Sequence, residues 1–284
     1  MSKFIYPSAV RDETSDMLFG NKVTDPYRWL EDPDAPETVA FVKSQNEIVQ
    51  SFLLKSDIRD KFKDKMTKLM DYEKHGCPMK RADWYYYFHN TGLQAQSVLF
   101  RKKELDGEGS VFFDPNTLSS DGTVSIGTFS FSEAGKYFAY ALSKSGSDWV
   151  SIHICKTDSA SRADIEPALE WAKFTSISWT HDDLGFTYNR YPTPKVSSDK
   201  AGTETDSNMD AAIYYHRLGT PQSQDILLFD VKENPSHMPR MEVSDDGKYL
   251  ICCVSESCDP QNKVYFAEIS SPLLNKPEFN VLVG

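Results

Sequence analysis

The stretch that decides the fold is residues 243–250, which read Val-Ser-Asp-Asp-Gly-Lys-Tyr-Leu. Residues 131–138 repeat it closely as Phe-Ser-Glu-Ala-Gly-Lys-Tyr-Phe, and residues 179–186 repeat it more loosely as Trp-Thr-His-Asp-Asp-Leu-Gly-Phe. In each copy a hydroxyl residue and one or two acids can accept hydrogen bonds from nearby backbone N–H groups. Glycine supplies a turn conformation with positive φ, and an aromatic residue resumes the strand. Each copy therefore predicts a β-hairpin.

The spacing of these copies is that of a repeated sheet. Gly135, Gly185 and Gly247 are separated by 50 and 62 positions, close to the roughly 40 to 50 residues of a β-propeller blade with added loop insertions. Strand-forming residues flank every copy. Turns of this composition also occur singly in β-rich proteins, but three at comparable spacing favour a mainly β protein made of propeller blades.

Composition excludes several classes of partner. The chain has 284 residues, of which 39 % are hydrophobic, and it is long enough for two domains. Its formal charge of −11 argues against nucleic acid and against an anionic membrane surface as partners. The sequence has no run of about 18 apolar residues and no apolar signal segment near its start. A cytoplasmic location is therefore expected.

Cysteine and histidine usage predicts neither disulfides nor a metal site. The five cysteines are an odd number without framework spacing, so most are expected to be buried thiols. The six histidines are scattered without a His-x-x-x-His or Cys-x-x-Cys pair. No Gly-rich phosphate loop or paired-carboxylate arrangement occurs either. We expect no metal and no cofactor.

The first 70 residues differ from the rest. Residues 25–33, Asp-Pro-Tyr-Arg-Trp-Leu-Glu-Asp-Pro, suggest an ordered loop. A helix is expected to follow, capped by Asp34 with Pro36 in its first turn, and a second helix is expected over residues 58–70. Both have an apolar face, and the β-rich remainder does not obviously require them. We expect residues 1–70 to form an arm that packs on another body.

From residue 71 onward the pattern is strand after strand. The strands fall into about four sheets of four, with the last sheet incomplete. Residues 192–210 are polar and are expected to form a long mobile loop. A four-bladed ring is possible in principle, but the sequence shows no obvious means of closing one.

No nucleophile is found in an activating setting. The nearest approach to a Gly-x-Ser-x-Gly elbow is residues 145–149, Ser-Gly-Ser-Asp-Trp, which has the wrong glycine spacing and lies between two strands. From the residues alone the chain is a propeller-like scaffold with a helical arm, and no reaction follows from it.

A resemblance supplies the missing function. Residues 25–33, preceded by Arg-Asp-Glu-Thr at 11–14, look like the N-terminal signature of the prolyl oligopeptidase family of serine peptidases. Further matches run along the chain, at residues 87–94, 145–150, 179–182, 202–205 and 255–260. Their order and gaps resemble prolyl oligopeptidase more than the oligopeptidase B or dipeptidyl peptidase branches.

This resemblance implies a seven-bladed propeller that caps an α/β-hydrolase catalytic domain. Residues 1–70 would belong with the catalytic domain, and residues 71–284 would form the first four or so blades. The catalytic serine, aspartate and histidine would lie outside this chain, so the C-terminal remainder of the enzyme is the expected partner. The expected substrates are short peptides, cut on the carboxyl side of proline after attack by serine.

The resemblance also implies a substrate-facing set in the propeller. Phe174, Met238 and Cys258 align with an aromatic residue, a methionine and a cysteine that line an apolar subsite. Aromatic, thioether and thiol groups together form an adaptable apolar wall. Taken singly, a Phe or Met in a β protein is more often a core residue. The resemblance favours the substrate-facing role for Phe174 and Cys258, whereas the residues around Met238 diverge from the family.

Three further positions are expected near this set. Ser255 stands where the family commonly has an arginine three positions before the cysteine, so we expect a weaker preference for acidic residues on the amino side of proline. Asp148 and Trp149 match a motif near the interface between the two domains, and we expect them to support the subsite rather than touch substrate.

Two other functions remain open. A peptide macrocyclase of the same family would resolve the acyl-enzyme with a substrate amine instead of water. A non-catalytic propeller that gathers partners would fold alone as a soluble monomer, whereas half of an enzyme would expose strand edges and an apolar helix face.

Overall fold

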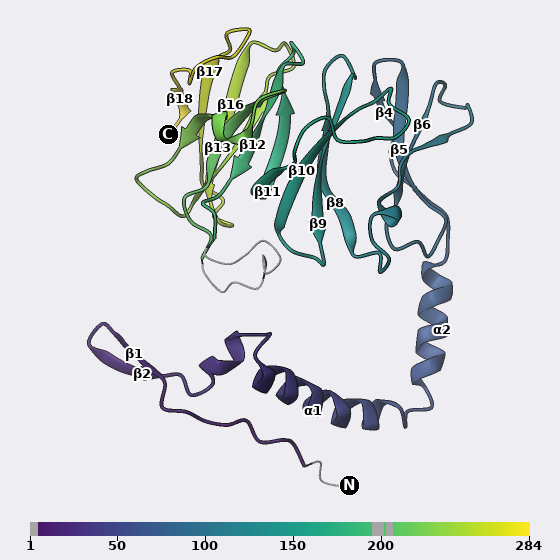
Figure 1. Ribbon diagram of the computed structural model, residues 1–284, viewed down its shortest axis with the longest axis vertical. Helices are drawn as coiled ribbons and strands as arrows, with labels where there is room; N and C mark the ends of the chain where they lie inside the picture. The colour runs from purple at the N-terminus through teal and green to yellow at the C-terminus, as the bar shows by residue number, and fades with distance from the viewer. Residues whose placement is uncertain (1–4, 195–201, 203–206) are drawn as a thin grey trace. The chain divides into compact units, whose positions relative to one another are not determined.

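The computed structural model describes residues 5–194, 202 and 207–284 (Figure 1). The described chain is mainly β and divides into two compact units. Unit one comprises the described residues up to Tyr72, and unit two comprises those from Glu73 onward.

Unit one contains one hairpin and two helices. Strands β1 (Ser15–Leu18) and β2 (Asn21–Thr24) pair antiparallel, and a 3-10 turn (Arg28–Glu31) leads to α1 (Pro36–Leu53) and α2 (Arg59–Met70). Pro36 occupies the first turn as predicted. The predicted cap is wrong: the N-cap position belongs to Ala35, because the helix begins one residue later than an Asp34 cap requires.

Polar contacts order the loop of residues 25–33. The guanidinium of Arg28 binds both Asp25, at 2.9 Å, and Asp16 of β1. Trp29 donates from Nε1 to the Val10 carbonyl oxygen, and its own carbonyl accepts from the Thr38 hydroxyl in α1. These contacts join the opening segment, the hairpin and the first helix into one unit.

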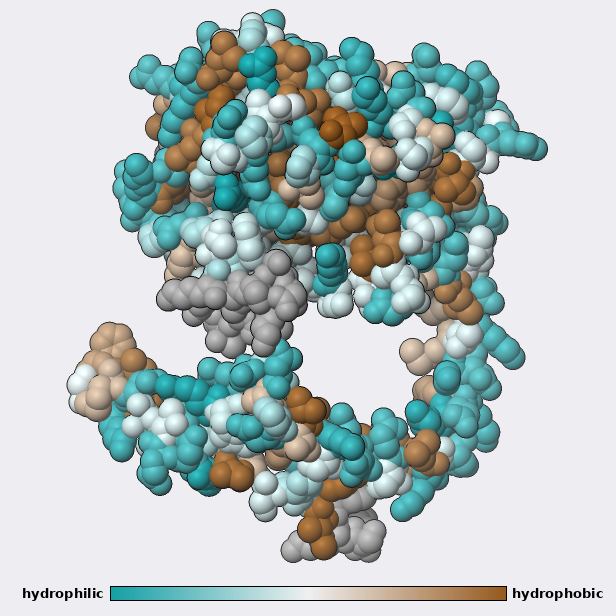
Figure 2. Space-filling view, in the orientation of Figure 1, coloured by the Kyte–Doolittle hydropathy of each residue, from teal (hydrophilic) through white to brown (hydrophobic). Residues whose placement is uncertain are grey.

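The two helices expose apolar side chains. In the described residues α2 has no buried residue, and α1 buries only Thr38. Apolar groups are visible on the surface of unit one in Figure 2. The exposed apolar residues of the helices are Val39, Val42, Val49, Phe52, Leu53, Phe62, Met66, Leu69 and Met70.

Unit two is built of antiparallel strands in three hydrogen-bonded sheets. The first sheet contains β3 (Lys74–His75), β4 (Met79–Arg81), β5 (Trp84–Asn90), β6 (Val98–Lys102) and β7 (Ser110–Phe113). The second contains β8 (Val124–Phe131), β9 (Tyr137–Lys144), β10 (Trp149–Lys156), β11 (Leu169–Trp179), β12 (Gly185–Arg190), β13 (Ala212–Arg217) and β14 (Ile226–Asp230). The third contains β15 (His237–Val243), β16 (Tyr249–Glu256), β17 (Asn262–Glu268) and β18 (Asn280–Val283).

The sequence predicts separate sheets of about four strands, but the long strand β11 joins two groups of strands into one seven-stranded sheet. Residues Leu169, Ala172 and Lys173 of β11 pair with β10, and β12 pairs with Ala172 and again with Ile177–Trp179. The register shifts between these two parts, and Phe174 in the gap has a φ of +47°. One strand therefore ends one blade and begins the next.

The core lies between neighbouring sheets as well as within them. Phe112 and Phe113 of β7 belong to the same buried cluster as Phe131 and Phe138 of the next sheet. Another buried cluster joins β13 and β14 to β15 and β16. Strands β11 and β15 of neighbouring sheets are also linked, since the Val243 N–H in β15 donates to the Ser178 hydroxyl in β11 at 2.9 Å. Successive sheets that pack against one another in this way are typical of propeller blades.

The three turn copies have the predicted side-chain hydrogen bonds. The hydroxyls of Ser132 and Ser244 accept from the N–H groups of Tyr137 and Tyr249, and the Asp182 carboxylate accepts from the Leu184 N–H. The predicted role of glycine needs one correction. In two copies the N–H of Gly135 or Gly247 donates to the carbonyl of the serine three residues earlier, and both glycines have positive φ. In the third copy the residue with positive φ is Asp183, at +56°, and its N–H donates to the Thr180 carbonyl three residues earlier. Gly185 is not in the turn but is the first residue of β12. A Cβ on Gly185 would meet the His216 carbonyl oxygen at 2.2 Å, so this glycine permits close strand approach.

Strand β15, which leads into the turn of residues 243–250, contains Pro239. A proline cannot donate to a sheet ladder and is tolerated at an edge. Within the described residues β15 is the edge strand of its sheet, and the Pro239 carbonyl accepts a hydrogen bond from the Asn189 side chain.

Candidate functional site

The predicted site residues lie at one end of the strands of unit two. Trp149 begins β10 and Met238 is the second residue of β15, where it is the register partner of Ser255 in β16. The two regions are connected, because Trp149 packs on Tyr191 just after β12, and Asn189 of β12 hydrogen-bonds to Pro239.

Phe174 lies in the irregular part of β11, where the register with β12 shifts. Its positive φ turns the side chain out of the alternating pattern, and 40 % of the residue surface is exposed. The ring meets Tyr191 edge to face, with centroids 6.4 Å apart. Lys173 Nζ lies 5.5 Å from the Phe174 ring centroid and 4.8 Å from that of Trp149. The aromatic surface therefore carries a positive charge beside it.

Met238 and Ser255 face one another, and Cys258 follows them. Met238 and Ser255 are half-buried. Strand β16 ends at Glu256, Ser257 adopts a φ of +48°, and the exposed Cys258 lies in the resulting turn. The structure thus brings Met238 close to Ser255 as strand neighbours.

Tyr191 connects Phe174 to β15. Burial raises the pKa of the Tyr191 phenol, and the charge of Arg240 partly offsets this. Arg240 lies two residues beyond Met238, and residues two apart on a strand share a face. Arg240 is therefore placed on the Met238 face of β15, and its charge acts on Tyr191, which contacts Phe174.

A tight hairpin positions Asp148 and Trp149. Ser145 and Gly146 both have positive φ, as a two-residue type I′ turn requires, and the Ser147 N–H donates to the Lys144 carbonyl. Trp149 is buried against Tyr191 and Trp171, whereas Asp148 is exposed. Trp149 has the geometry of a residue that holds Tyr191 in place.

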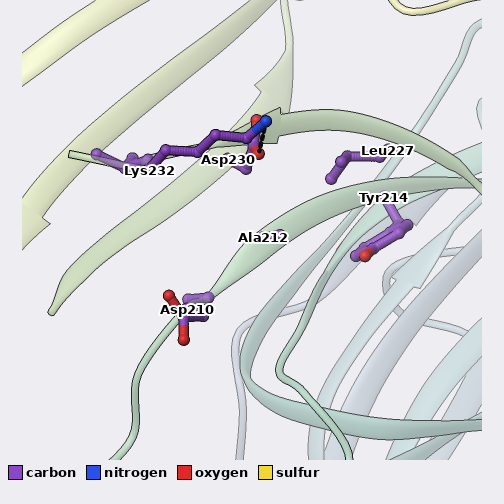
Figure 3. A pocket seen from close by; sticks show the side chains of 8 residues that line it. Asp210, Ala212, Tyr214, Leu227, Asp230 and Lys232 are labelled. Atoms are coloured by element: carbon purple, nitrogen blue, oxygen red, sulfur yellow. Dashed lines mark ion pairs between the residues drawn. The ribbon is translucent and has the colours of Figure 1, made fainter. Parts of the chain in front are cut away.

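A pocket at the same end was not predicted from the sequence (Figure 3). It has a volume of about 200 Å³ and lies where β13 begins and β14 ends. Lys232 and Asp230 form an ion pair of 3.7 Å at its edge. The lining residues are Asp210, Ala211, Ala212, Tyr214, Leu227, Asp230, Val231 and Lys232.

The predicted loop of residues 192–210 lies largely outside the described residues. The predicted cysteine environment is partly wrong: Cys155 and Cys252 are buried, but Cys77, Cys253 and Cys258 are exposed. Cys253 is exposed because successive residues of a strand face opposite sides of the sheet, and Cys252 takes the buried side; Cys77 and Cys258 lie outside the strands. Burial raises the pKa of both the Cys155 and Cys252 thiols to about 12.

Two clusters of histidine and carboxylate side chains were not predicted from the sequence. His216 is buried, with Nδ1 2.7 Å from Asp225 Oδ1 and Nε2 2.7 Å from Glu166 Oε1. In the first sheet Glu73, His75 and His89 bring three potential metal ligands together. Strand register was the only available signal for the second cluster, since it places His75 directly opposite His89.

Comparison with known proteins decides the family. Residues 7–283 match the family described as prolyl oligopeptidase, N-terminal beta-propeller domain. The chain belongs to the prolyl oligopeptidase family. The predicted fold class is thereby confirmed.

Individual relatives agree. Prolyl oligopeptidase A from Amanita bisporigera is 40 % identical over 93 % of this chain and 38 % of the relative. A prolyl endopeptidase from Elizabethkingia miricola is 37 % identical over 96 % of this chain and 37 % of the relative. The solved prolyl oligopeptidase B from Galerina marginata, bound to a 25mer macrocyclization substrate, gives a TM-score of 0.84 at 31 % identity, covering 98 % of this chain and 41 % of that one.

The chain therefore spans about 38 % of the length of the curated relatives it matches. In the part that the structure describes, none of the helices is both long and apolar enough to span a membrane.

Proposed function

We propose that this chain is the N-terminal portion of a cytoplasmic serine endopeptidase that cuts short peptides on the carboxyl side of proline. The family match over residues 7–283 carries this proposal, together with relatives named prolyl endopeptidase. The chain supplies the propeller that gates the active site and part of the substrate pocket. The remaining blades, the catalytic domain and the catalytic triad come from outside the chain.

The surface of unit one supports this division. Residues 1–70 expose the apolar faces of α1 and α2, and burying one large apolar side chain typically contributes about 1.5–3 kcal/mol. We assign these faces to contact with the catalytic domain. This assignment accounts for the large apolar side chains that α1 and α2 expose.

Phe174, Met238 and Cys258 form the proposed peptide-binding wall. Phe174 is exposed, Met238 is half-buried, and Cys258 is exposed, so all three offer surface to a ligand. Trp149 supports the wall by packing on Tyr191, which in turn meets the Phe174 ring. Asp148 lies beside this support on the exposed surface.

Ser255 weakens the preference for acidic peptides. It lies opposite Met238, so an arginine at this position would place a positive charge next to the wall. Replacing Ser255 by arginine should raise the kcat/KM ratio of a glutamate-containing peptide to its glutamine counterpart by about tenfold, the effect of about 1.4 kcal/mol. An unchanged ratio would contradict the assignment of Ser255.

The second candidate is peptide macrocyclisation. A dual function macrocyclase-peptidase from Amanita bisporigera is 36 % identical over 96 % of this chain, close to the identity of the oligopeptidases. Hydrolysis adds water to the cleaved bond, whereas cyclisation releases a product lighter by one water than the linear acid. A non-catalytic module remains the third candidate.

One experiment separates these functions. The complete protein that carries this chain is incubated with matched peptides that contain proline or alanine at one position, and products are identified by mass. We expect linear products cut after proline and no cut after alanine. Cyclic products would favour the macrocyclase, and intact peptides with a properly folded protein would favour the binding module.

A further inference from the structure

A three-residue cluster in the first sheet, made of Glu73, His75 and His89, is separate from the proposed peptide wall. Strands β3 and β5 pair antiparallel, and His75 is the direct register partner of His89. Glu73 precedes His75 by two residues, and residues two apart on an extended chain point to the same side. The local backbone therefore gathers a carboxylate and two imidazoles on one face.

The distances show that these groups converge. Glu73 Oε1 lies 2.8 Å from His89 Nε2 and 3.4 Å from His75 Nε2. One potential ligand atom from each residue lies within 4.8 Å of the other two. The two imidazole rings are stacked, with centroids 4.5 Å apart and planes inclined by 17°. A single carboxylate oxygen is thus shared by two imidazole nitrogens.

Two imidazole nitrogens and one carboxylate oxygen are the donor set of zinc sites that keep one position open. Zinc bonds of about 2.0–2.1 Å at tetrahedral angles place neighbouring ligand atoms about 3.3 Å apart. The spacing between Glu73 and His75 already fits this value. The spacing between Glu73 and His89 fits after a small lengthening, once zinc replaces their hydrogen bond.

The surroundings hold the imidazoles while leaving the carboxylate accessible. The His89 ring packs edge-on against Phe100 at 5.2 Å, and the His75 ring stacks near Tyr87 at 6.3 Å. Only 15 % of the His89 side chain is exposed, against 62 % for Glu73.

We propose that Glu73, His75 and His89 bind a zinc ion whose fourth position is open to water. Strand β3 has only two residues, and its pairing with β5 is its one strand contact in the described part of the chain. The ion would fasten β3 to β5 where unit two begins. Its effect is on the stability of this sheet edge rather than on the peptide wall.

Zinc titration of the intact protein, stripped of metal with a chelator, tests this proposal. Isothermal titration calorimetry should show one zinc site per chain. Glu73→Gln, His75→Gln and His89→Gln should each weaken affinity more than about tenfold, because even residues outside the ligand shell typically contribute 10- to 100-fold. His153→Gln is the matched control, since His153 pairs with one carboxylate, Asp164, at 2.7 Å without a second histidine.

Two further measurements keep the test decisive. In chelator, the three variants should unfold within a few degrees of the parent protein, and added zinc should raise the midpoint of the parent alone. Anomalous diffraction at the zinc edge should give a peak bonded to His75 and His89. Absence of zinc binding, equal affinity in the variants, or a peak at other residues such as the exposed Cys253 would overturn the proposal.

Discussion

Unit two buries its large apolar side chains between sheets, whereas the helices of unit one expose theirs. Phe138 in β9 has no exposed surface and meets Phe112, Phe131 and Tyr140, while Phe62 in α2 is 63 % exposed. Apolar burial is the main stabilising contribution in folding. The difference indicates that unit two has a core of its own, whereas the apolar faces of α1 and α2 are those that we propose to contact the catalytic domain.

The largest expected effect is on the core of unit two. Phe138→Ala should lower the free energy of unfolding by about 3–5 kcal/mol, because it leaves a cavity among packed aromatic rings. The measurement is urea unfolding of the complete protein followed by a signal from the β-rich part. A loss below about 1 kcal/mol would show that this cluster is not tightly packed.

A second change tests the close strand approach in the same unit. Gly185→Ala places a Cβ against the His216 carbonyl oxygen, where backbone must move, and should cost about 3 kcal/mol. Gly127→Ala is the matched control, since the nearest atom to its Cβ is a Val150 methyl at 3.5 Å. Similar urea midpoints for the two variants would contradict the account of Gly185.

A third change addresses pH. Burial alone would lower the pKa of His216, but hydrogen bonds to Asp225 and Glu166 outweigh it and raise this pKa to about 9. Stability from the charged imidazole is fully present below the unfolded value of about 6.5. It should be lost as pH rises through 9, by about 2–3 kcal/mol. Urea midpoints measured from pH 6.5 to 9.5 should fall in the parent protein and stay nearly flat in His216→Gln.

The smallest of these effects distinguishes the two units most directly. In the complete protein, Phe62→Ala should weaken the binding free energy between unit one and the catalytic domain by about 2 kcal/mol. Lys63→Ala on the same helix should change this free energy by less than about 0.5 kcal/mol. Limited proteolysis near residues 70–73 reports the attachment. Equal cleavage rates for the two variants would show that the apolar face stays exposed in the complete protein.

Much of the local structure could be predicted because hairpin turns have a local chemistry. The Ser132-to-Gly135 and Ser244-to-Gly247 turns follow from residues that hydrogen-bond within their own loop. Gly185 could not be placed correctly, because its role depends on the neighbouring strand that contains His216. Pro239 in β15 shows the same limit, because a proline is tolerated at a sheet edge and the edge position depends on the other strands.

The candidate site shows a similar division. The sequence resemblance gave Phe174, Met238 and Cys258, but not the change of strand partner that exposes Phe174 or the Tyr191 ring beside it. The cluster of Glu73, His75 and His89 depends on strand register, which places His75 opposite His89, 14 positions later in the chain. Spacing rules for metal ligands do not include such a pair.

The central claim is that the Phe174 end of unit two faces peptide substrate. The most direct measurement is kcat/KM of the complete protein for a short peptide cut after proline, comparing Phe174→Ala with Phe266→Ala, a half-buried aromatic in the middle of β17. We predict at least about a tenfold loss for Phe174→Ala, equal to about 1.4 kcal/mol of transition-state binding, and less than a twofold change for the control. Equal activity of the two variants would contradict the claim.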